Sequence, residues 1–503
     1  GDASAAETVD GYITRTKLAN DSLNALVVPL FERARAEAVE ADRRRERGEP
    51  LGPLHGVPVT VKECFHVAGT PSTIGLTHCR ELLDEDGVLV RRLRAAGAII
   101  IGKTNVPQLM LWHESDNPVY GRTNNPWDLE RSPGGSTGGE AALIAAGGSP
   151  LGLGSDLGGS IRLPCHFCGI HGLKPTSFRL PRRGMRGNLH GFEAFVLQPG
   201  PMARRVEDLE LAMRVLTQET PDARNDPDMP PVAWPDWHGV SIRGLRVGVM
   251  EDDGYFRPVP GIRRLVREAA ESLAQQGAIV EIYKPDGTRE LVELYMALAG
   301  ADGGADARRM LRGSEVDPRL KRMAWLAGLN RPTRMMLAKS LRMRGQHMLA
   351  DMLSSLGPLS ADRYWQLTER MSSAVRRIEK KWHQHGFDVL LMPPHGLPAM
   401  PHRKPIDLLA AASYAFVPNL LGWPAGVVSL SRVRLGEESD RPASRDLVIR
   451  RAIESETGSA GLPIGVQVLA PAWRDHVVLG VMAALEQAFE TDADFPAGRC
   501  SVN

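Results

Sequence analysis

The sequence lacks a disulfide framework. Its 503 residues include only five cysteines, Cys64, Cys79, Cys165, Cys168 and Cys500. So few cysteines in so long a chain exclude a small cross-linked scaffold, and their odd number favours reduced thiols. We therefore expect a cytoplasmic protein.

Two further absences narrow the class of protein. No run of 18 or more apolar residues is present, so no membrane-spanning helix is expected. The formal net charge is only +1, which gives no overall attraction to nucleic acid. With 43% hydrophobic and 24% charged residues, the composition is that of a globular protein with a large core.

Short apolar, β-branched runs alternate with helix-length segments along most of the chain. This alternation is typical of an α/β sheet protein. The expected strands are 57–62, 98–103, 245–250, 278–283, 388–394 and 463–470, and the expected helices include 88–96, 261–276 and 475–490. Residues 1–50 predict two helices, 5–20 and 29–47, which we interpret as an N-terminal packing segment.

Three other segments carry weaker signals. Residues 331–356 mix Met and Leu with Arg and Lys at helical spacing, which fits either a helix pair capping the core or an amphipathic cap on a membrane surface. Residues 432–461 are polar and are interpreted as a surface insertion with a helix near 446–453. The stretch 218–238, rich in Pro, Asp and Trp, is expected to cross the surface irregularly.

The strongest chemical signal is a glycine-rich tract with hydroxyl side chains, SPGGSTGGEAALIAAGGSPLGLGSDLGGSIRLP, at residues 132–164. Ser136, Thr137 and Ser160 lie among glycines, which leave backbone N–H groups accessible to an oxyanion. The G-x-S-x-G pattern of Ser-His-Asp enzymes is absent around both serines. A phosphate-binding loop is excluded as well, because Gly139 is followed by Glu140 instead of Lys.

Lysine is then the candidate base. Lys62 ends the apolar run GVPVTVK, where burial would lower the pKa of its ammonium group toward neutrality. A neutral amine can accept a proton. A lone lysine at a strand end is usually exposed, and only the joint occurrence of Lys62 with Ser136 and Ser160 indicates a buried base.

These motifs, taken together, resemble the amidase signature family of serine hydrolases. The resemblance is carried by GVPVTVKE, SPGGSTGG, GSDLGGSIRLPCHFCGIHGLKPT and GLPIGVQVLAP, and it is most similar to the members that cleave fatty acid amides. It implies a catalytic domain over residues 51–495, with a large twisted mixed β-sheet surrounded by many α-helices. No metal and no cofactor are implied.

The resemblance also assigns roles to single residues. It implies a Ser-Ser-Lys triad in which Ser160 is the nucleophile, Ser136 is a bridging serine preceded by a cis peptide, and Lys62 is the base. The backbone N–H groups of Leu157, Gly158, Gly159 and Ser160 would hold the oxyanion. The main-chain carbonyl of Met110 would face the substrate, which Ser136 would also contact.

The surroundings of the triad raise two further expectations. Thr137 stands where serine is commonest in the family; it keeps a hydroxyl that can support Ser136. Asp156 and Arg162 flank the nucleophile, and we expect them to form an ion pair that fixes its loop. Cys165 and Cys168 lack a second pair of zinc ligands, so Cys168 is interpreted as a buried core residue.

The family implies amide hydrolysis, with esters or carbamates as accompanying substrates, and the apolar residues 110–112 favour hydrophobic acyl or aryl groups. Two alternatives stay open: a glutaminase subunit of a tRNA-dependent amidotransferase, and a catalytically dead scaffold of the same fold. The expected partners are a small-molecule amide, a membrane surface contacted peripherally and a second copy of the chain in a homodimer.

The triad hypothesis makes a direct prediction. Ser160→Ala should abolish turnover and Lys62→Ala should nearly abolish it, because the first variant lacks the attacking oxygen and the second lacks the base. Both variants should stay folded. Amide hydrolysis by the purified variants checks this, and full activity in either one would contradict the triad.

Overall fold

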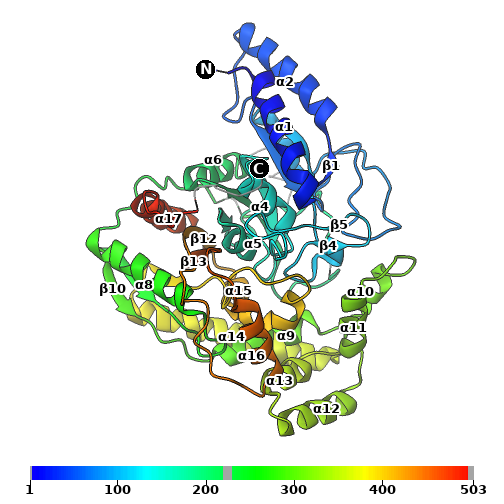
Figure 1. Ribbon diagram of the computed structural model, residues 1–503, viewed down its shortest axis with the longest axis vertical. Coiled ribbons are helices and arrows are strands. Elements are labelled where there is room, and N and C mark those ends of the chain that lie inside the picture. Colours follow the sequence, from blue (N-terminus) through cyan, green and yellow to red (C-terminus); the bar gives the residue numbers. More distant parts are fainter. Residues whose placement is uncertain (1–2, 188, 219–228, 231, 497–503) are drawn as a thin grey trace.

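An 11-stranded sheet runs through the molecule and is surrounded by helices (Figure 1). The structure is a computed structural model that describes residues 3–187, 189–218, 229–230 and 232–496. In order across the sheet, the strands are β1 (Leu26–Pro29), β3 (Ile99–Thr104), β2 (Pro58–Lys62), β6 (Leu151–Asp156), β8 (Gln198–Ala203), β7 (His171–Lys174), β12 (Ala425–Arg432), β13 (Pro463–Leu469), β11 (Val389–Met392), β9 (Arg246–Val249) and β10 (Ile279–Ile282).

The sheet is mixed, as the family resemblance implied. Strand β2 runs parallel to β3 and β6, and β9 runs parallel to β10 and β11, while the other neighbouring strands are antiparallel. A separate two-stranded ribbon pairs β4 (Asp116–Asn117) with β5 (Gly121–Arg122). The predicted α/β class is therefore confirmed.

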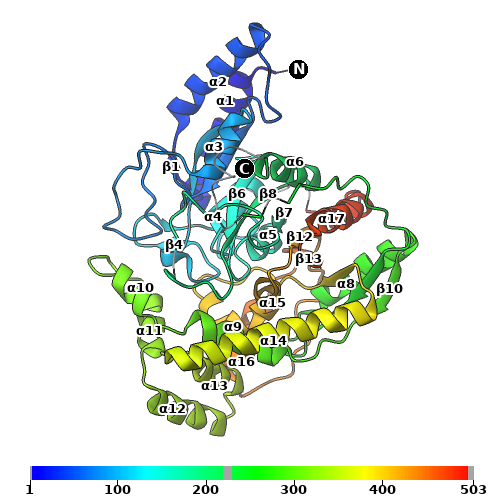
Figure 2. The ribbon, with the colours of Figure 1, turned by 180° about the vertical axis from the view of Figure 1, so that it is seen from behind.

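Helices cover both faces of the sheet (Figure 2). They are α1 (Ala5–Leu23), α2 (Phe31–Glu46), α3 (Val88–Ala95), α4 (Gly138–Ala145), α5 (Arg162–Cys168), α6 (Val206–Leu216), α8 (Pro260–Gln275), α9 (Thr288–Ala299), α10 (Ala305–Met310), α11 (Pro318–Ala327), α12 (Arg331–Met343), α13 (His347–Ser355), α14 (Ala361–His385), α15 (Ser413–Leu421), α16 (Leu447–Glu456) and α17 (Asp475–Phe489), with 3-10 turns η1 (Gln108–Met110) and η2 (Pro405–Ala412).

Glycines let helices approach the middle of the sheet closely. A Cβ on Gly426 of β12 would collide with Met482 of α17, and a Cβ on Gly172 of β7 would collide with Cys165 of α5. Gly426 pairs with Leu173, the neighbour of Gly172, so these two contacts lie on opposite faces. Helix α5, which directly follows the predicted nucleophile, is thereby packed against the centre of the sheet.

The six predicted strands are all present, but five other strands of the large sheet, β1, β6, β7, β8 and β12, and the short strands β4 and β5 escaped prediction. Two of them are unusual in composition, because β6 reads LGLGSD and β8 reads QPGPMA. Glycine and proline normally argue against central strands. In β8, residue 200 has to be glycine, because a Cβ at this position would lie 2.1 Å from the Leu173 carbonyl oxygen of the next strand.

The N-terminal residues form the two predicted helices, with one addition. Helices α1 and α2 pack through Val9, Ile13 and Ala38 against Ile101 of the sheet. Between the helices, β1 joins the sheet as its edge strand, antiparallel to β3.

The segment 331–356 forms a pair of packed helices, α12 and α13, joined through Ala338, Ala350 and Leu353. Residues 432–461 contribute α16, whose Val448, Ala452 and Glu456 are buried.

Most of the stretch 218–238, which was predicted to cross the surface irregularly, lies outside the described residues. Among the helices that the structure describes, none is long and apolar enough to cross a membrane.

Candidate active site

Lys62 is the last residue of β2, and its side chain is fully buried. Its Nζ lies 2.7 Å from Oγ of Ser136, 3.0 Å from Oγ of Ser155 and 3.3 Å from the Ser155 carbonyl oxygen. Burial lowers the pKa of Lys62 from 10.5 to about 8, because the ammonium form loses its hydration. A substantial fraction of this amine is therefore neutral near pH 8.

The peptide bond between Gly135 and Ser136 is cis, as the family resemblance implied. Its neighbourhood leaves no space for a side chain at residue 135, where a Cβ would lie 2.2 Å from the Glu114 carbonyl oxygen. The next residue, Thr137, donates its N–H to the Ser160 carbonyl at 3.2 Å and its hydroxyl to the Ser155 carbonyl at 3.2 Å. Thr137 thus ties the two serine loops together.

Ser160 lies in the turn between β6 and α5 and is 7% exposed. Asp156 organises this turn by accepting hydrogen bonds from the N–H of Gly159 at 2.8 Å and of Ile161 at 3.1 Å. The predicted ion pair is present: Nη2 of Arg162 lies 2.9 Å from Oδ1 of Asp156, and both side chains are buried.

The ion pair is held from several sides. Nη1 of Arg162 donates to Gln467 of β13 at 2.7 Å, and Nη2 donates to the Ala415 carbonyl of α15 at 2.9 Å. Burial alone would raise the pKa of Asp156, but the charge and hydrogen bonds of Arg162 hold it well below its usual range. The carboxylate is therefore ionised throughout the physiological pH range.

The four N–H groups predicted to bind an oxyanion differ in their contacts. The Gly159 N–H already donates to Asp156. Within the described part of the chain, the N–H groups of Leu157, Gly158 and Ser160 have no hydrogen-bond partner. Three of the four predicted donors are thus unpaired, and the fourth is engaged by a carboxylate.

The carbonyls of the same loop are held by two side chains that sequence analysis missed. The hydroxyl of Tyr295 donates to the Leu157 carbonyl at 3.3 Å, and Nε2 of His113 lies 3.1 Å from the Gly158 carbonyl. Burial lowers the pKa of His113 to about 4, so its ring is neutral and Nε2 must carry the proton donated to this carbonyl. No sequence motif marks either residue.

Met110 ends the 3-10 turn η1 in a left-handed conformation, with φ of 53°. Such backbone angles are uncommon outside glycine and often occur near functional sites. Two residues later, the Trp112 carbonyl oxygen lies 2.7 Å from the position of a Cβ on Gly135. The Met110 segment is therefore adjacent to the Ser136 loop, while the role of its carbonyl stays a prediction.

A further buried acid lies near the predicted base. Glu140 of α4 accepts hydrogen bonds from Thr60 of β2 and from Thr104 of β3, the latter at 2.7 Å. Burial raises its pKa to about 7, and the charge of Lys62 acts in the opposite direction. In the sequence, the presence of Glu140 in place of a lysine argued against a phosphate-binding loop. In the structure, its hydrogen bonds connect α4 to β2 and β3.

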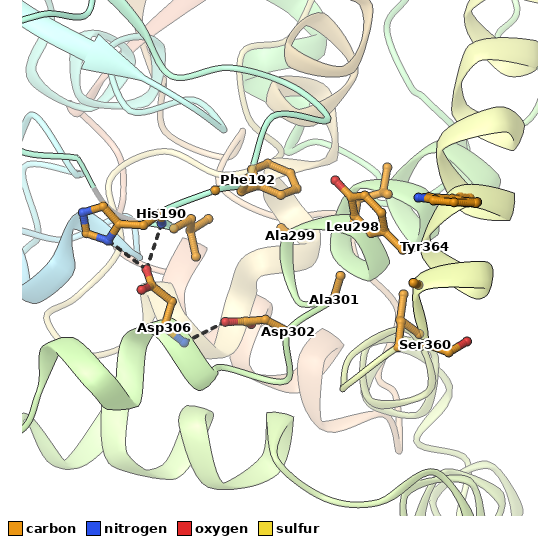
Figure 3. A pocket seen from close by; sticks show the side chains of 14 residues that line it. His190, Phe192, Leu298, Ala299, Ala301, Asp302, Asp306, Ser360 and Tyr364 are labelled. Atoms are coloured by element: carbon orange, nitrogen blue, oxygen red, sulfur yellow. Dashed lines mark hydrogen bonds and ion pairs between the residues drawn. The ribbon is translucent and has the colours of Figure 1, made fainter.

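A cavity of about 280 Å³ opens beside α9, α10 and the start of α14 (Figure 3). Its walls include Phe192, Leu298, Leu359 and Tyr364, with His190 and Asp306 hydrogen-bonded to each other at one side.

An aromatic stack connects this cavity to the serine loops. Phe192 packs edge-on against Phe195, at 4.8 Å between ring centroids, and Phe195 stacks on Tyr295 at 4.6 Å. Tyr295 in turn stacks on Phe416 at 4.2 Å. Because Tyr295 also contacts the Leu157 carbonyl, the stack extends from a wall of the cavity to the loop of the predicted nucleophile, Ser160.

The cysteines near the site are structural. Cys165 and Cys168 are fully buried in α5, as predicted for Cys168. Burial raises the pKa of Cys165 well above the usual range of a thiol, which disfavours a reactive thiolate.

Comparison with known proteins identifies the family. The family model described as Amidase matches residues 7–479. Fatty-acid amide hydrolase 1 of Sus scrofa is 38% identical over 446 residues, which cover 87% of this chain and 76% of that protein. A solved fatty acid amide hydrolase superposes with a TM-score of 0.86 at 26% identity, covering 98% of this chain and 83% of that chain.

A shorter stretch of the chain is similar to a different kind of protein. One subunit of the glutamyl-tRNA(Gln) amidotransferase of Chloroflexus aggregans is 37% identical over 314 residues, which cover 61% of this chain and 63% of that protein. The match to the amidase family model covers most of the chain, including most of the first 50 residues, in which the sequence had no distinctive motif. The chain belongs to the amidase signature family and is an amide-hydrolysing enzyme.

Proposed function

We propose that this enzyme cleaves amides of hydrophobic acyl or aryl acids through a Ser160–Ser136–Lys62 relay and an acyl-enzyme. The observation that carries the proposal is the 2.7 Å approach of Lys62 Nζ to Ser136 Oγ in a fully buried setting. A lysine with a pKa of about 8 can serve as a base near pH 8, because a substantial fraction of the amine is neutral there. An exposed lysine, with its ordinary pKa of 10.5, is almost entirely protonated at that pH.

The relay begins with the neutral amine of Lys62. Lys62 accepts the proton of the Ser136 hydroxyl, and Ser136 accepts the proton of Ser160 as the Ser160 oxygen attacks the substrate carbonyl. The negative charge then develops on the carbonyl oxygen. The N–H groups of Leu157, Gly158 and Ser160 are proposed to stabilise it, and Gly159 joins them only if its N–H is shared with Asp156.

Collapse of the tetrahedral intermediate breaks the carbon–nitrogen bond. The proton held on Lys62 returns through Ser136 to the leaving nitrogen, which departs as a neutral amine. Water then attacks the Ser160 ester with the same relay as base, releases the carboxylic acid and restores the Ser160 hydroxyl. Esters and carbamates fit the same sequence of steps.

The substrate class is inferred from the cavity and from the relatives. The wall residues Phe192, Leu298, Leu359 and Trp365 are apolar, so burying an acyl chain or an aryl ring there is favourable by about 25 cal/mol per Å². The relatives named fatty acid amide hydrolase support the same class. The charged groups of free glutamine would lose hydration against these walls.

A panel of substrates tests the proposed function. The wild-type enzyme should hydrolyse a long-chain fatty amide, an aryl acetanilide and an aryl carbamate. Its kcat/KM for the fatty amide should exceed that for glutamine by at least about 100-fold, because several buried methylenes each contribute ~0.8 kcal/mol. Ser160→Ala serves as the control for uncatalysed hydrolysis. Cleavage of glutamine alone would favour the amidotransferase alternative, and cleavage of no substrate would favour the inactive scaffold.

The activity should depend on pH through Lys62. Only the neutral amine accepts a proton, and the folded pKa is about 8, so kcat/KM should rise about tenfold per pH unit below that value and level off above it. The measurement is kcat/KM for an aryl amide between pH 5.5 and 9.5, with circular dichroism as the control for folding. A profile that peaks below pH 6 would contradict lysine as the base.

We also propose that the α12–α13 pair contacts a membrane surface. Met336 and Met343 are 69% and 74% exposed, on a helix that also carries the basic residues Lys339 and Arg342. Wild type should co-sediment with anionic liposomes at low salt, and Met336→Ser with Met343→Ser should reduce the bound fraction severalfold, because apolar side chains and basic charge both favour such a surface. Leu435→Ser, at an exposed residue elsewhere, is the control. Absence of wild-type binding would remove this proposal.

A further inference from the structure

We infer that Tyr295 is a positioning residue for the reaction: its hydroxyl aims the Gly158 N–H at the oxyanion. The inference rests on the proposed function. It is carried by the hydrogen bond of 3.3 Å from Tyr295 to the Leu157 carbonyl, which is the only hydrogen bond made by this peptide unit among the described residues.

The geometry of the peptide bond links the two ends of this unit. The Leu157 carbonyl and the Gly158 N–H belong to one planar peptide group, and in a trans peptide they point in opposite directions. A hydroxyl that holds the carbonyl on one side therefore fixes the direction of the N–H on the other. No cis bond occurs at this position within the described residues.

The neighbouring peptide unit, between Gly158 and Gly159, is hydrogen-bonded to other protein groups at both ends. Its carbonyl, from Gly158, is held by His113, and its N–H, from Gly159, donates to Asp156. It is thus fixed at both ends and presents no unpaired donor. In the part of the chain that the structure describes, the unit held by Tyr295 has only its carbonyl hydrogen-bonded, which leaves the Gly158 N–H available to the substrate.

The absence of a side chain at residue 158 fits this role. Gly159 has φ of 105°, which favours glycine, whereas Gly158 does not have a positive φ. What excludes a side chain at Gly158 is contact, because a Cβ would lie 2.1 Å from the Tyr295 hydroxyl oxygen. The hydroxyl of Tyr295 thus occupies the space that a side chain at residue 158 would need.

The phenol is held rigidly and in its donor form. Its ring lies between Phe416 and Phe195, at 4.2 and 4.6 Å between centroids. Burial raises the pKa of Tyr295 far above neutrality, so the hydroxyl keeps its proton and can donate. Because Phe195 also contacts Phe192 in the cavity wall, an acyl chain in the cavity would pack against the far end of the stack that fixes this donor.

The substitution Tyr295→Phe tests this role, because it keeps the stacked ring and removes only the hydroxyl. We expect kcat to fall about tenfold, less than the loss of about 100-fold or more on deleting an oxyanion donor outright, while KM stays within about twofold. The matched control is Tyr283→Phe, which removes a hydroxyl from a tyrosine packed against Phe387, away from the cavity and the serine loops, and should leave kcat unchanged.

A pair of inhibitors separates positioning from packing. A trifluoromethyl ketone with the substrate's acyl chain is attacked by Ser160 and bound as an oxyanion, whereas the corresponding alcohol cannot form one. Tyr295→Phe should weaken the ketone about tenfold and leave the affinity of the alcohol unchanged. Unchanged kcat, or an equal loss of affinity for both inhibitors, would overturn the inference. A wild type that neither hydrolyses amides nor binds the ketone would instead overturn the proposed function, and the inference with it.

Discussion

The rest of the site depends on one fully buried ion pair, Asp156 with Arg162. Burying two charges is costly, and such a pair persists only where hydrogen bonds satisfy the remaining donors and acceptors. Here the carboxylate accepts from the N–H groups of Gly159 and Ile161, and the guanidinium donates to Gln467 and Ala415. The ion pair and these hydrogen bonds therefore fix the shape of the turn that presents Ser160.

In the proposed relay, this arrangement allows a serine to be activated without histidine. A lysine offers a base of suitable strength only when its charge is disfavoured, and the burial of Lys62 at the end of β2 supplies that condition. Ser136 and Ser155 contact its Nζ as neutral hydroxyls, and the charges of Asp156 and Glu140 raise the pKa of Lys62 by less than burial lowers it. Burial raises the pKa of Glu140 to about 7, and its carboxyl group is hydrogen-bonded to Thr60 and Thr104.

The residues proposed to carry the chemistry could be predicted from the sequence, and so could one ion pair beside them, whereas the more distant residues that hold the site could not. Lys62, Ser136 and Ser160 lie in motifs with a recognisable order, and the Asp156–Arg162 pair could be inferred because both flank the nucleophile. Tyr295 is 138 residues away from Leu157, and a single tyrosine in an amphipathic helix has no signature. Strands β6 and β8 were missed for a related reason, since their glycines are explained only by close neighbours such as Thr137, Ile161 and Leu173.

The reach of Arg162 has a consequence for folding. Its bond to Gln467 spans 305 residues of sequence, and its contact with Ala415 spans 253. Bringing together segments so far apart in the sequence requires the closure of long loops, which costs chain entropy and slows folding. The turn that carries Ser160 therefore has its full set of contacts only when β13 and α15 are docked, so any loosening of these two elements would reach Ser160 through Arg162.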